Sequence, residues 1–591
     1  MMNMLLVVIC GGFVLFLAAR TYPFIISRVF EPDDSRPTPA TEFADENDYV
    51  ASPSAVVFAH HFASIAGAGP IIGPIIALAY GWGPAWIWIV IGGIFYGAVH
   101  DMSAMFVSLR EGGKTIAEVA RRTLGTSGCV LFLLLLLIVI SVVNAIFLKM
   151  SASALQSAYP LEALGLGDAQ TLLRTRTEGG VVKGIIGGIA TTSVIVMTIA
   201  APVLGWLIHR KRVRTGRVFM AAGIIGVGGV VLGFFMPVSL SMNAWTWTLI
   251  VYLFFASWLP VWLIIQPRDF MNVQVLYGGV LLLVAGTIVA GMSGDGGGSS
   301  AMQIPFSRMM EGSQEKGPIW PIMFITIACG AISGFHSLVA TGTTIKQIGR
   351  ESDCRRIGYN AMIFESFLAL LVLTAVASQM PFSEYQRTVE HAGGWILTFA
   401  IGCGRLFANL GIPLAIGSVL GILIIEGFLV TTLDTSIRLT RYLVEELSAQ
   451  VFGEPKAATS PSRTIARRIV STLVAIGLMM IFVLSPQAEK ALWPFFGAGN
   501  QLIGALTLTT VSVWLLQRGK RAWFTLIPAA GMVVTAIAAL MYIVHQKYAG
   551  DADNRIVLIC AGGVLLMLAM GFVIVATLRM WAAVRRSAKA T

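Results

Sequence analysis

Long apolar stretches alternate with short polar segments along nearly the whole chain. About 15 of these stretches are long enough to cross a hydrocarbon core of about 30 Å, which takes roughly 20 residues as a helix. They lie near residues 4–26, 55–80, 84–109, 127–150, 182–208, 217–237, 245–265, 270–292, 319–345, 359–380, 411–436, 466–485, 492–516, 522–544 and 555–578. Barrel strands would be shorter, about ten residues, and would alternate. The pattern therefore predicts an all-α polytopic membrane protein with about 15 transmembrane helices.

Composition supports a lipid environment. Of the 591 residues, 56% are hydrophobic and only 12% are charged; an exterior this apolar would aggregate in water. The net charge of +11 could suggest a nucleic-acid partner. However, the lysines and arginines lie in short clusters between apolar stretches, as in cytoplasmic loops of membrane proteins. We expect the lipid bilayer as a partner and no nucleic acid.

The basic clusters also predict the orientation. If the N-terminus lies outside, the odd-numbered connections are cytoplasmic, and these hold the clusters at 110–122, 209–217, 346–356, 438–468, 517–521 and 579–589. The outer connections at 291–300 and 549–554 are Gly-rich or acidic. A signal peptide at the start is disfavoured, because Arg20 and Arg28 follow the apolar run and no basic region precedes it. The prediction is N-terminus outside and C-terminus cytoplasmic.

The second apolar stretch carries residues that break helices. Gly67, Gly69, Pro70 and Pro74 fall close together, and each proline removes a backbone donor. Inside a bilayer, freed backbone groups are tolerated only where they line a cavity or meet other protein. A discontinuous helix of this kind exposes carbonyls to cations and helix N-termini to anions. The alternative is a kinked packing helix with close glycine contacts. Another helix break is predicted at 257–260, in the seventh stretch.

The ninth stretch, 319–345, is unusually polar. Ser333, Ser337, Thr341 and Thr344 are spaced four, four and three residues apart, which would place four hydroxyls on one helix face beside His336. The alternative is that each hydroxyl bonds back to its own helix.

Ionisable side chains within the apolar stretches need a reason, because burying one costs several kcal/mol, about 2.5–3.5 at the bilayer centre on insertion scales. Histidine, or a desolvated carboxylate, changes charge in the working pH range. The primary candidates for ion or proton coupling are His61, Asp101, His336, Ser333, Ser337 and Thr341. The secondary candidates are His100, Tyr96, Glu426 and Asp434.

Two alternatives stay open for these groups. They could form a satisfied polar network that holds helices together, and Asp434 could pair with Arg438 one turn later. Imidazole and carboxylate also suit zinc or iron. Adjacent His60 and His61 would point about 100° apart on a helix and could not easily share one ion. We therefore expect no metal and no other cofactor.

Six motifs occur in order between about residues 50 and 510: HHFASIAGAGPIIGP, YGAVHD, QPRDF, SGFHSLVATGTT, TTLDTSIRLTRYL and LWPFFGAGNQLIGAL. Together they resemble the carbon starvation protein A (CstA) family. The resemblance implies a bacterial inner-membrane permease for pyruvate or peptides, with proposed proton coupling. It also implies membership of the amino acid–polyamine–organocation superfamily, whose core is a LeuT-type 5+5 inverted repeat.

The resemblance implies a division of the chain. It gives an accessory helix at 1–30, a cytoplasmic linker at 31–54, a first repeat at 55–240, a second repeat at 241–437 with a re-entrant or interfacial segment at 391–409, a cytoplasmic loop at 438–465, and accessory helices with a basic tail at 466–591. The breaks at 67–74 and 257–260 would then face each other at the midplane. Asn500 and Gln501 would lie outside the core, as scaffold or dimer contacts, so a homodimer is left open.

A small carboxylate, such as pyruvate or a peptide C-terminus, would suit helix N-termini at the break. The candidate substrate-binding residues are Gly67, Ala68, Gly69, Asn144, Ser257, Trp258 and Phe335. The aromatic residues among them could equally be ordinary core packing.

The sequence thus predicts a secondary active transporter that works by alternating access. The motifs HExxH and GxSxG are absent, which argues against an intramembrane enzyme, and no Walker motif GxxxxGK[ST] occurs. The alternatives are a membrane nutrient sensor, or sodium-coupled transport of another small carboxylate or an amino acid. Pyruvate and peptides fit the pattern equally well.

Overall fold

The computed structural model of the chain is dominated by long apolar helices. It describes residues 2–590 apart from 45–48, 168–169, 210, 212, 214, 261–262, 294–299, 391–393, 454–460, 485–488 and 550–555. The predicted loops at 209–217, 291–300, 438–465 and 549–554, and the start of the 391–409 segment, therefore lie partly outside the described residues.

Twelve helical spans among the described residues are long and apolar enough to cross a membrane. They are α1 (Met4–Ser27) with η1 (Arg28–Phe30); α5 (Trp82–Gly92), η3 (Gly93–Gly97) and α6 (Ala98–Arg110); α8 (Thr126–Gln156); α9 (Gly187–His209); α10 (Thr215–Phe235); α12 (Ile265–Met292); η6 (Arg355–Tyr359) with α16 (Asn360–Gln379); α19 (Leu414–Phe452); α20 (Pro461–Val483); α21 (Glu489–Gln517); α22 (Trp523–Ala549); and α23 (Ile556–Ala590). A bent pair, α3 (Ser54–Ile65) and α4 (Gly69–Ala77) with η2 (Leu78–Tyr80), makes a thirteenth when its two halves are counted as one span.

The predicted number of about 15 spans is not confirmed, and the difference falls on two stretches. The 245–265 stretch gives α11 (Met242–Trp258), which has only 17 residues. The 319–345 stretch splits into η4 (Ile319–Met323), α14 (Phe324–Thr326), α15 (Phe335–Gly342) and η5 (Thr344–Gln347). Hydropathy measures how apolar a stretch is and takes no account of the length or continuity of its helix. Both stretches were therefore counted as spans.

The split of the ninth stretch corrects the predicted hydroxyl face. Ser333 lies in the non-helical turn at 327–334, which we call the second break, and Thr344 lies in η5. Only Ser337 and Thr341 share α15. Spacing alone assumed one continuous helix, and the segment around Gly330 and Gly334 does not form one.

The first break is the turn Ala66–Ala68 between α3 and α4, which are bent by 47°. It lies against the second break through two glycines. A Cβ on Gly69 would lie 2.3 Å from the Cys329 Sγ, and a Cβ on Gly73 would lie 2.8 Å from the Thr326 carbonyl oxygen. The glycines therefore allow the two broken elements to touch.

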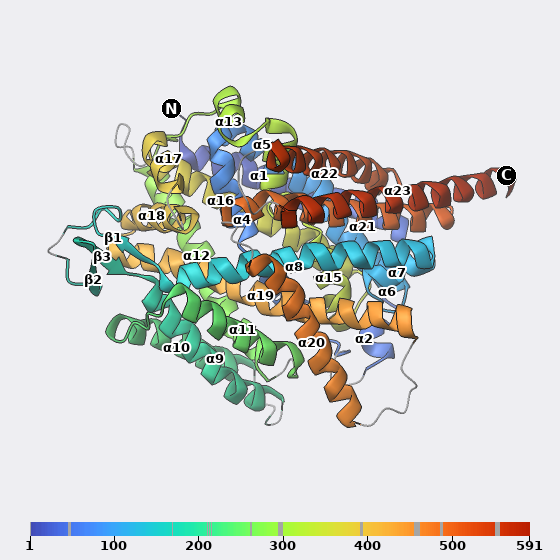
Figure 1. The fold of residues 1–591 in the computed structure, drawn as a ribbon, viewed down its shortest axis with the longest axis horizontal. Coiled ribbons are helices and arrows are strands. Elements are labelled where there is room, and N and C mark those ends of the chain that lie inside the picture. The colour runs from blue at the N-terminus through green and yellow to red at the C-terminus, as the bar shows by residue number, and fades with distance from the viewer. Residues whose placement is uncertain are drawn as a thin grey trace.

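Smaller elements cap the bundle at its two ends (Figure 1). An antiparallel sheet, which the all-α prediction did not include, consists of β1 (Ala158–Pro160), β2 (Thr175–Glu178) and β3 (Val181–Ile185) in the order β1-β3-β2. The short helices are α2 (Pro39–Glu42), α7 (Ile116–Leu124), α13 (Met309–Lys316), α17 (Phe382–Glu390) and α18 (Gly394–Ala408). The sheet, α13, α17 and the N-terminus lie toward one end of the long axis, and α2, α7 and the C-terminus toward the other.

The region predicted as a break at 257–260 is the end of a helix. α11 stops at Trp258, and the guanidinium of Arg438 donates to the carbonyl oxygens of Ala256 at 2.6 Å and Leu259 at 2.5 Å. These carbonyls would otherwise have no partner within the helix. The Ser257 hydroxyl lies 3.2 Å from that of Thr472 on α20. The 257–260 region thus does not form the predicted break. The first break packs instead against the second break at 327–334, through Gly69 and Cys329.

We predict that Gly69→Ala destabilises the protein by about 1–3 kcal/mol through overpacking against Cys329. Removing the opposing side chain should relieve the clash, so Gly69→Ala combined with Cys329→Gly should recover most of the loss relative to Cys329→Gly alone. Thermal unfolding in detergent measures both effects.

The matched control is Gly278→Ala in α12, where a Cβ meets no atom within 4 Å. Alanine favours a helix by up to about 1 kcal/mol over glycine, so this variant should unfold at an equal or higher temperature. Equal destabilisation by both substitutions would contradict the contact between the two breaks.

Candidate functional site

A buried polar cluster lies where three helical elements meet beside the second break. The carboxylate of Asp101 on α6 bonds two imidazoles at once: Oδ1 lies 2.7 Å from His100 Nδ1, and Oδ2 lies 2.8 Å from His336 Nδ1. The other ring nitrogen of His336, Nε2, lies 3.3 Å from Glu365 Oε2 on α16. All four side chains are fully buried. The structure thus brings together the predicted residues Asp101, His336 and His100.

Several polar atoms of this cluster lack a hydrogen-bond partner among the described residues. They are His100 Nε2, His336 Nε2 and both carboxylate oxygens of Glu365. Buried polar atoms are nearly always bonded, and each exception calls for an explanation. A chain of imidazoles and carboxylates with spare hydrogen-bonding capacity can take up and pass on a proton. Glu365 was not among the predicted site residues, because its place beside His336 depends on contact between two helices and no local sequence pattern marks it.

The same region contains donors that fit a transition metal. Cys329 Sγ, a ring nitrogen of His336 and a carboxylate oxygen of Glu365 all lie within 4.8 Å of one another. Thiolate, imidazole and carboxylate are ligands that zinc and iron accept. The expectation of no metal considered His60, His61, Asp101 and His336, and so did not weigh this donor set.

His61 on α3 is held differently. Its Nδ1 lies 2.9 Å from the Thr344 hydroxyl on η5, and its Nε2 has no hydrogen-bond partner among the described residues. His61 therefore connects α3 to the far end of the segment that carries His336.

Asn500 on α21 holds the second break in place. Its Oδ1 accepts from the Phe335 amide at 2.9 Å, its Nδ2 donates to the Ser333 hydroxyl at 3.0 Å, and its carbonyl accepts from the Gly334 amide at 3.0 Å. Gln501 donates to the Phe324 carbonyl at 2.7 Å. Both side chains are fully buried, so they fit the predicted scaffold role and not a dimer contact at the surface. They belong to the structure around the site.

α8 and α19 enclose the first break. A Cβ on Gly67 would lie 3.0 Å from the Thr432 hydroxyl on α19 and 3.5 Å from the Phe147 ring on α8. The Thr432 hydroxyl is buried and has no hydrogen-bond partner among the described residues. Asn144 donates to the Thr440 hydroxyl of α19 at 2.9 Å, so the structure shows it joining α8 to α19.

A second buried cluster lies between α11, α12 and α19. The Arg268 guanidinium bonds both the Asp434 carboxylate and the Tyr252 hydroxyl, and Tyr252 also donates to Asp434 at 2.8 Å. Asp434 thus has Arg268 as its ion-pair partner, while Arg438 caps α11 instead. On the same helix, both carboxylate oxygens of Glu426 are buried without a hydrogen-bond partner among the described residues.

The remaining predicted residues have separate surroundings. Ser337 lies 3.1 Å from the Thr507 hydroxyl of α21, and Thr341 accepts from the Ile116 amide of α7 at 3.1 Å. Tyr96 is half-buried in η3 and packs edge-on against Trp88 at 5.5 Å. Trp258 ends α11, and its indole nitrogen has no hydrogen-bond partner among the described residues.

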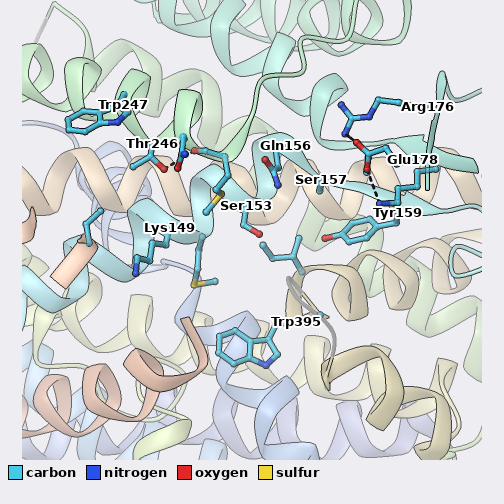
Figure 2. Close-up of a pocket in the computed structure, with 18 of the residues that line it drawn as sticks. Lys149, Ser153, Gln156, Ser157, Tyr159, Arg176, Glu178, Thr246, Trp247 and Trp395 are labelled. Carbon is cyan, nitrogen blue, oxygen red and sulfur yellow. Dashed lines mark hydrogen bonds and ion pairs between the residues drawn. The ribbon is translucent and has the colours of Figure 1, made fainter. Parts of the chain in front are cut away.

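Two cavities lie at the ends of this arrangement. One of about 640 Å³ is bordered by the last turns of α8, the sheet, and the starts of α11 and α18 (Figure 2). A smaller one of about 220 Å³ is lined by Thr341 and Gly342 of α15, together with residues of α7 and α19. Neither cavity reaches the cluster itself, which is closed.

The fold and the site together define a multi-pass α-helical membrane protein with two opposed helix breaks and a buried imidazole–carboxylate cluster beside them. The sequence model described as carbon starvation protein CstA matches residues 3–387 and 379–539. The chain belongs to that family.

Relatives with assigned names match along most of their length. The peptide transporter CstA of Bacillus subtilis (strain 168) is 30% identical over 98% of this chain and 97% of its own. The pyruvate/proton symporter BtsT of Escherichia coli (strain K12) is 26% identical over 90% of this chain and 81% of its own. Among solved structures, a manganese transporter of Eremococcus coleocola is similar, with a TM-score of 0.48 and 13% identity over 92% of this chain and 99% of that chain.

We predict that Asn500→Ala lowers stability by about 2–6 kcal/mol, because it leaves the buried Phe335 amide and Ser333 hydroxyl without their partner, at about 1–3 kcal/mol for each group. The matched control is Asn243→Ala, an exposed asparagine near the start of α11, which should change stability by no more than about 0.5 kcal/mol. Thermal unfolding of both variants in detergent provides the test. Similar unfolding temperatures for the two variants would show that Asn500 does not hold the break.

Proposed function

We propose that the protein is a secondary active transporter that imports pyruvate or small peptides by alternating access, coupled to protons. It would lie in the inner membrane of a bacterium, with the N-terminus outside and the C-terminus in the cytoplasm. The observation that carries this proposal is the Asp101–His336–Glu365 cluster beside two broken elements that touch. The names of the relatives, a pyruvate/proton symporter and peptide transporters, support the substrate classes.

The position of His336 supports proton coupling. Its two ring nitrogens face two carboxylates on different helices, Asp101 on α6 and Glu365 on α16. A protonated ring would attract both carboxylates, while a neutral ring could donate to only one. Histidine changes charge near physiological pH when unperturbed. Gain or loss of one proton therefore changes how firmly α15, a mobile element in this mechanism, is held to α6 and α16.

The substrate site would lie at the two breaks. α4 begins at Gly69 and α15 begins at Phe335; helix N-termini carry partial positive charge that favours a carboxylate. Gly67 and Ala68 would let the substrate approach the backbone closely, because they have little or no side chain. Pyruvate and the C-terminus of a short peptide share the carboxylate that such a site recognises.

An inverted repeat built on this site needs a different division of the chain. If the first break and the second break are equivalent positions of the two repeats, the second repeat starts near residue 319 and not at 241. The helices α9 and α10 then become an accessory hairpin. They form their own small apolar cluster with α12, which includes Met197, Val218 and Met271. The LeuT-type arrangement remains part of the proposal in this modified form.

One observation favours the sodium-coupled alternative. The Thr432 hydroxyl is buried beside Gly67 and has no hydrogen-bond partner among the described residues. Hydroxyl and backbone carbonyl oxygens are ligands suited to a hard cation. The uptake experiment below therefore includes a sodium gradient.

We predict that proteoliposomes accumulate labelled pyruvate or dipeptide under an inward proton gradient. His336→Ala and Asp101→Asn should each reduce accumulation to the level of empty liposomes, because each interrupts the proton-binding cluster. The matched control is His545→Ala on α22, an exposed histidine, which should transport like the wild type. The stability of each variant is checked by thermal unfolding.

Three outcomes would count against parts of this proposal. Absence of uptake for any carboxylate or peptide under either gradient would reject the transport function. Normal uptake by folded His336→Ala would assign the cluster to scaffold. Uptake driven only by sodium, and lost in Thr432→Val, would move the coupling site to the first break.

A chelator added during reconstitution tests whether uptake needs a metal at Cys329, His336 and Glu365.

A further inference from the structure

The larger cavity has a lining suited to small organic anions. Lys149 from α8 and Arg176 and Lys183 from the sheet border it, together with one carboxylate, Glu178. Glu178 pairs with Arg176 at 2.6 Å and with Lys183 at 2.9 Å. The four side chains together carry an excess of positive charge. Figure 2 shows Lys149, Arg176 and Glu178 around the cavity, together with Ser153 and Gln156 of α8.

An aromatic column connects this cavity to the first break. Trp395 of α18 borders the cavity and packs on Trp493 of α21, with ring centroids 5.5 Å apart. Trp493 packs on Phe496 at 5.1 Å, and Phe496 packs on Phe147 of α8 at 5.7 Å. Phe147 lies 3.5 Å from the Cβ position of Gly67.

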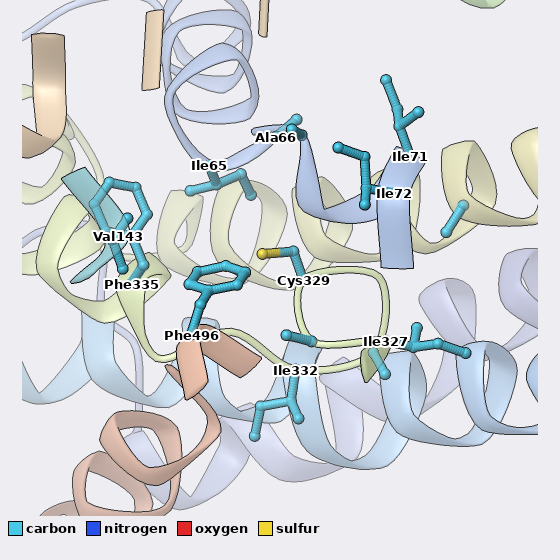
Figure 3. Close-up of a cluster of buried hydrophobic side chains, with 14 of the residues drawn as sticks. Ile65, Ala66, Ile71, Ile72, Val143, Ile327, Cys329, Ile332, Phe335 and Phe496 are labelled. Atoms are coloured by element: carbon cyan, nitrogen blue, oxygen red, sulfur yellow. The ribbon is translucent and has the colours of Figure 1, made fainter. Parts of the chain in front are cut away.

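The column is closed in this structure. All four rings are buried, and Trp395 is the most open at 8% exposure. Figure 3 shows Phe496 lying beside Phe335 and Cys329, at the second break. The column therefore fills the space between the cavity and both breaks.

We propose that the cavity is an outer vestibule in which a small organic carboxylate binds first, and that the column Trp395–Trp493–Phe496–Phe147 is the barrier between this vestibule and the site at the breaks. The proposal rests on the proposed function, whose orientation places this end of the molecule outside. Excess cationic charge in a recess concentrates anions there. The buried Trp493 indole N–H has no hydrogen-bond partner among the described residues, so it can donate to a carboxylate when the rings separate.

Charge-selective labelling tests the vestibule. Ser153 of α8 lines the cavity and is partly accessible. A Ser153→Cys variant, with the exposed Cys10 and Cys560 replaced by serine, is treated in intact cells with membrane-impermeant methanethiosulfonates, one anionic and one cationic. The ratio of anionic to cationic labelling rates should exceed that of Ser383→Cys, an exposed position on α17, by about tenfold or more. Pyruvate should slow labelling at position 153 only.

The native Cys329 tests the barrier. It is buried against Gly69 at the breaks. In a protein that keeps Ser153 and has Cys10 and Cys560 replaced by serine, Trp493→Ala should speed the labelling of Cys329 from outside by about tenfold or more. The substitution leaves a large cavity in the column. Trp493→Phe, which keeps a ring, should remain near the parent rate. Trp395→Ala, at the open end of the column, provides a second variant should Trp493→Ala fail to fold.

The outcomes separate the inference from the proposed function. Equal charge ratios at positions 153 and 383 would overturn the anion vestibule, whether or not pyruvate is transported. An unchanged Cys329 rate in both folded tryptophan-to-alanine variants would overturn the barrier. If uptake of pyruvate and peptides fails while both labelling results hold, the route stands as a path for another organic anion.

Discussion

A broken helix inside a bilayer leaves amides and carbonyls that water cannot reach, and the architecture of this protein depends on satisfying them. At the second break, the amides of Gly334 and Phe335 are taken by Asn500, on a helix far away in sequence. At the end of α11, the carbonyls of Ala256 and Leu259 are taken by Arg438. Unpaired, each such group would cost several kcal/mol in hydrocarbon. The helices that supply these partners are thereby fixed around the site.

The two buried clusters differ in the cation that faces their carboxylates: Arg268 faces Asp434, whereas His336 faces Asp101 and Glu365. Around Asp434, one carboxylate oxygen binds the Arg268 guanidinium and the Tyr252 hydroxyl, whereas Oδ1 has no hydrogen-bond partner among the described residues. Around His336, ring nitrogens and both oxygens of Glu365 are left without hydrogen bonds among the described residues. An arginine keeps its charge at any physiological pH, whereas an imidazole can gain or lose a proton there. This contrast is why proton coupling is proposed for the His336 cluster.

Sequence patterns predicted much of the frame and part of the site. The apolar stretches located nearly all the spanning helices, and the Gly/Pro cluster located the first break, because both signals are local. The structure brings His336, His100 and Asp101, all singled out from the sequence, into one buried cluster. The roles of Asn500, Glu365 and Arg438 were missed, since they depend on contacts between distant segments. The hydroxyl face failed because its spacing rule applies only within a continuous helix, and the segment is broken at 327–334.

The bond from Asn500 to Phe335 also has a consequence for the synthesis of the protein. The two residues are 165 positions apart, so at about 5–20 residues per second the ribosome needs roughly 8–33 s to add the second after the first. Throughout that interval, the amides of Gly334 and Phe335 lack the Asn500 side chain and carbonyl as hydrogen-bond acceptors. The breaks can therefore reach their final form only once α21 has been inserted, and a chain that stops short of it would present a defect that membrane quality-control proteases can recognise.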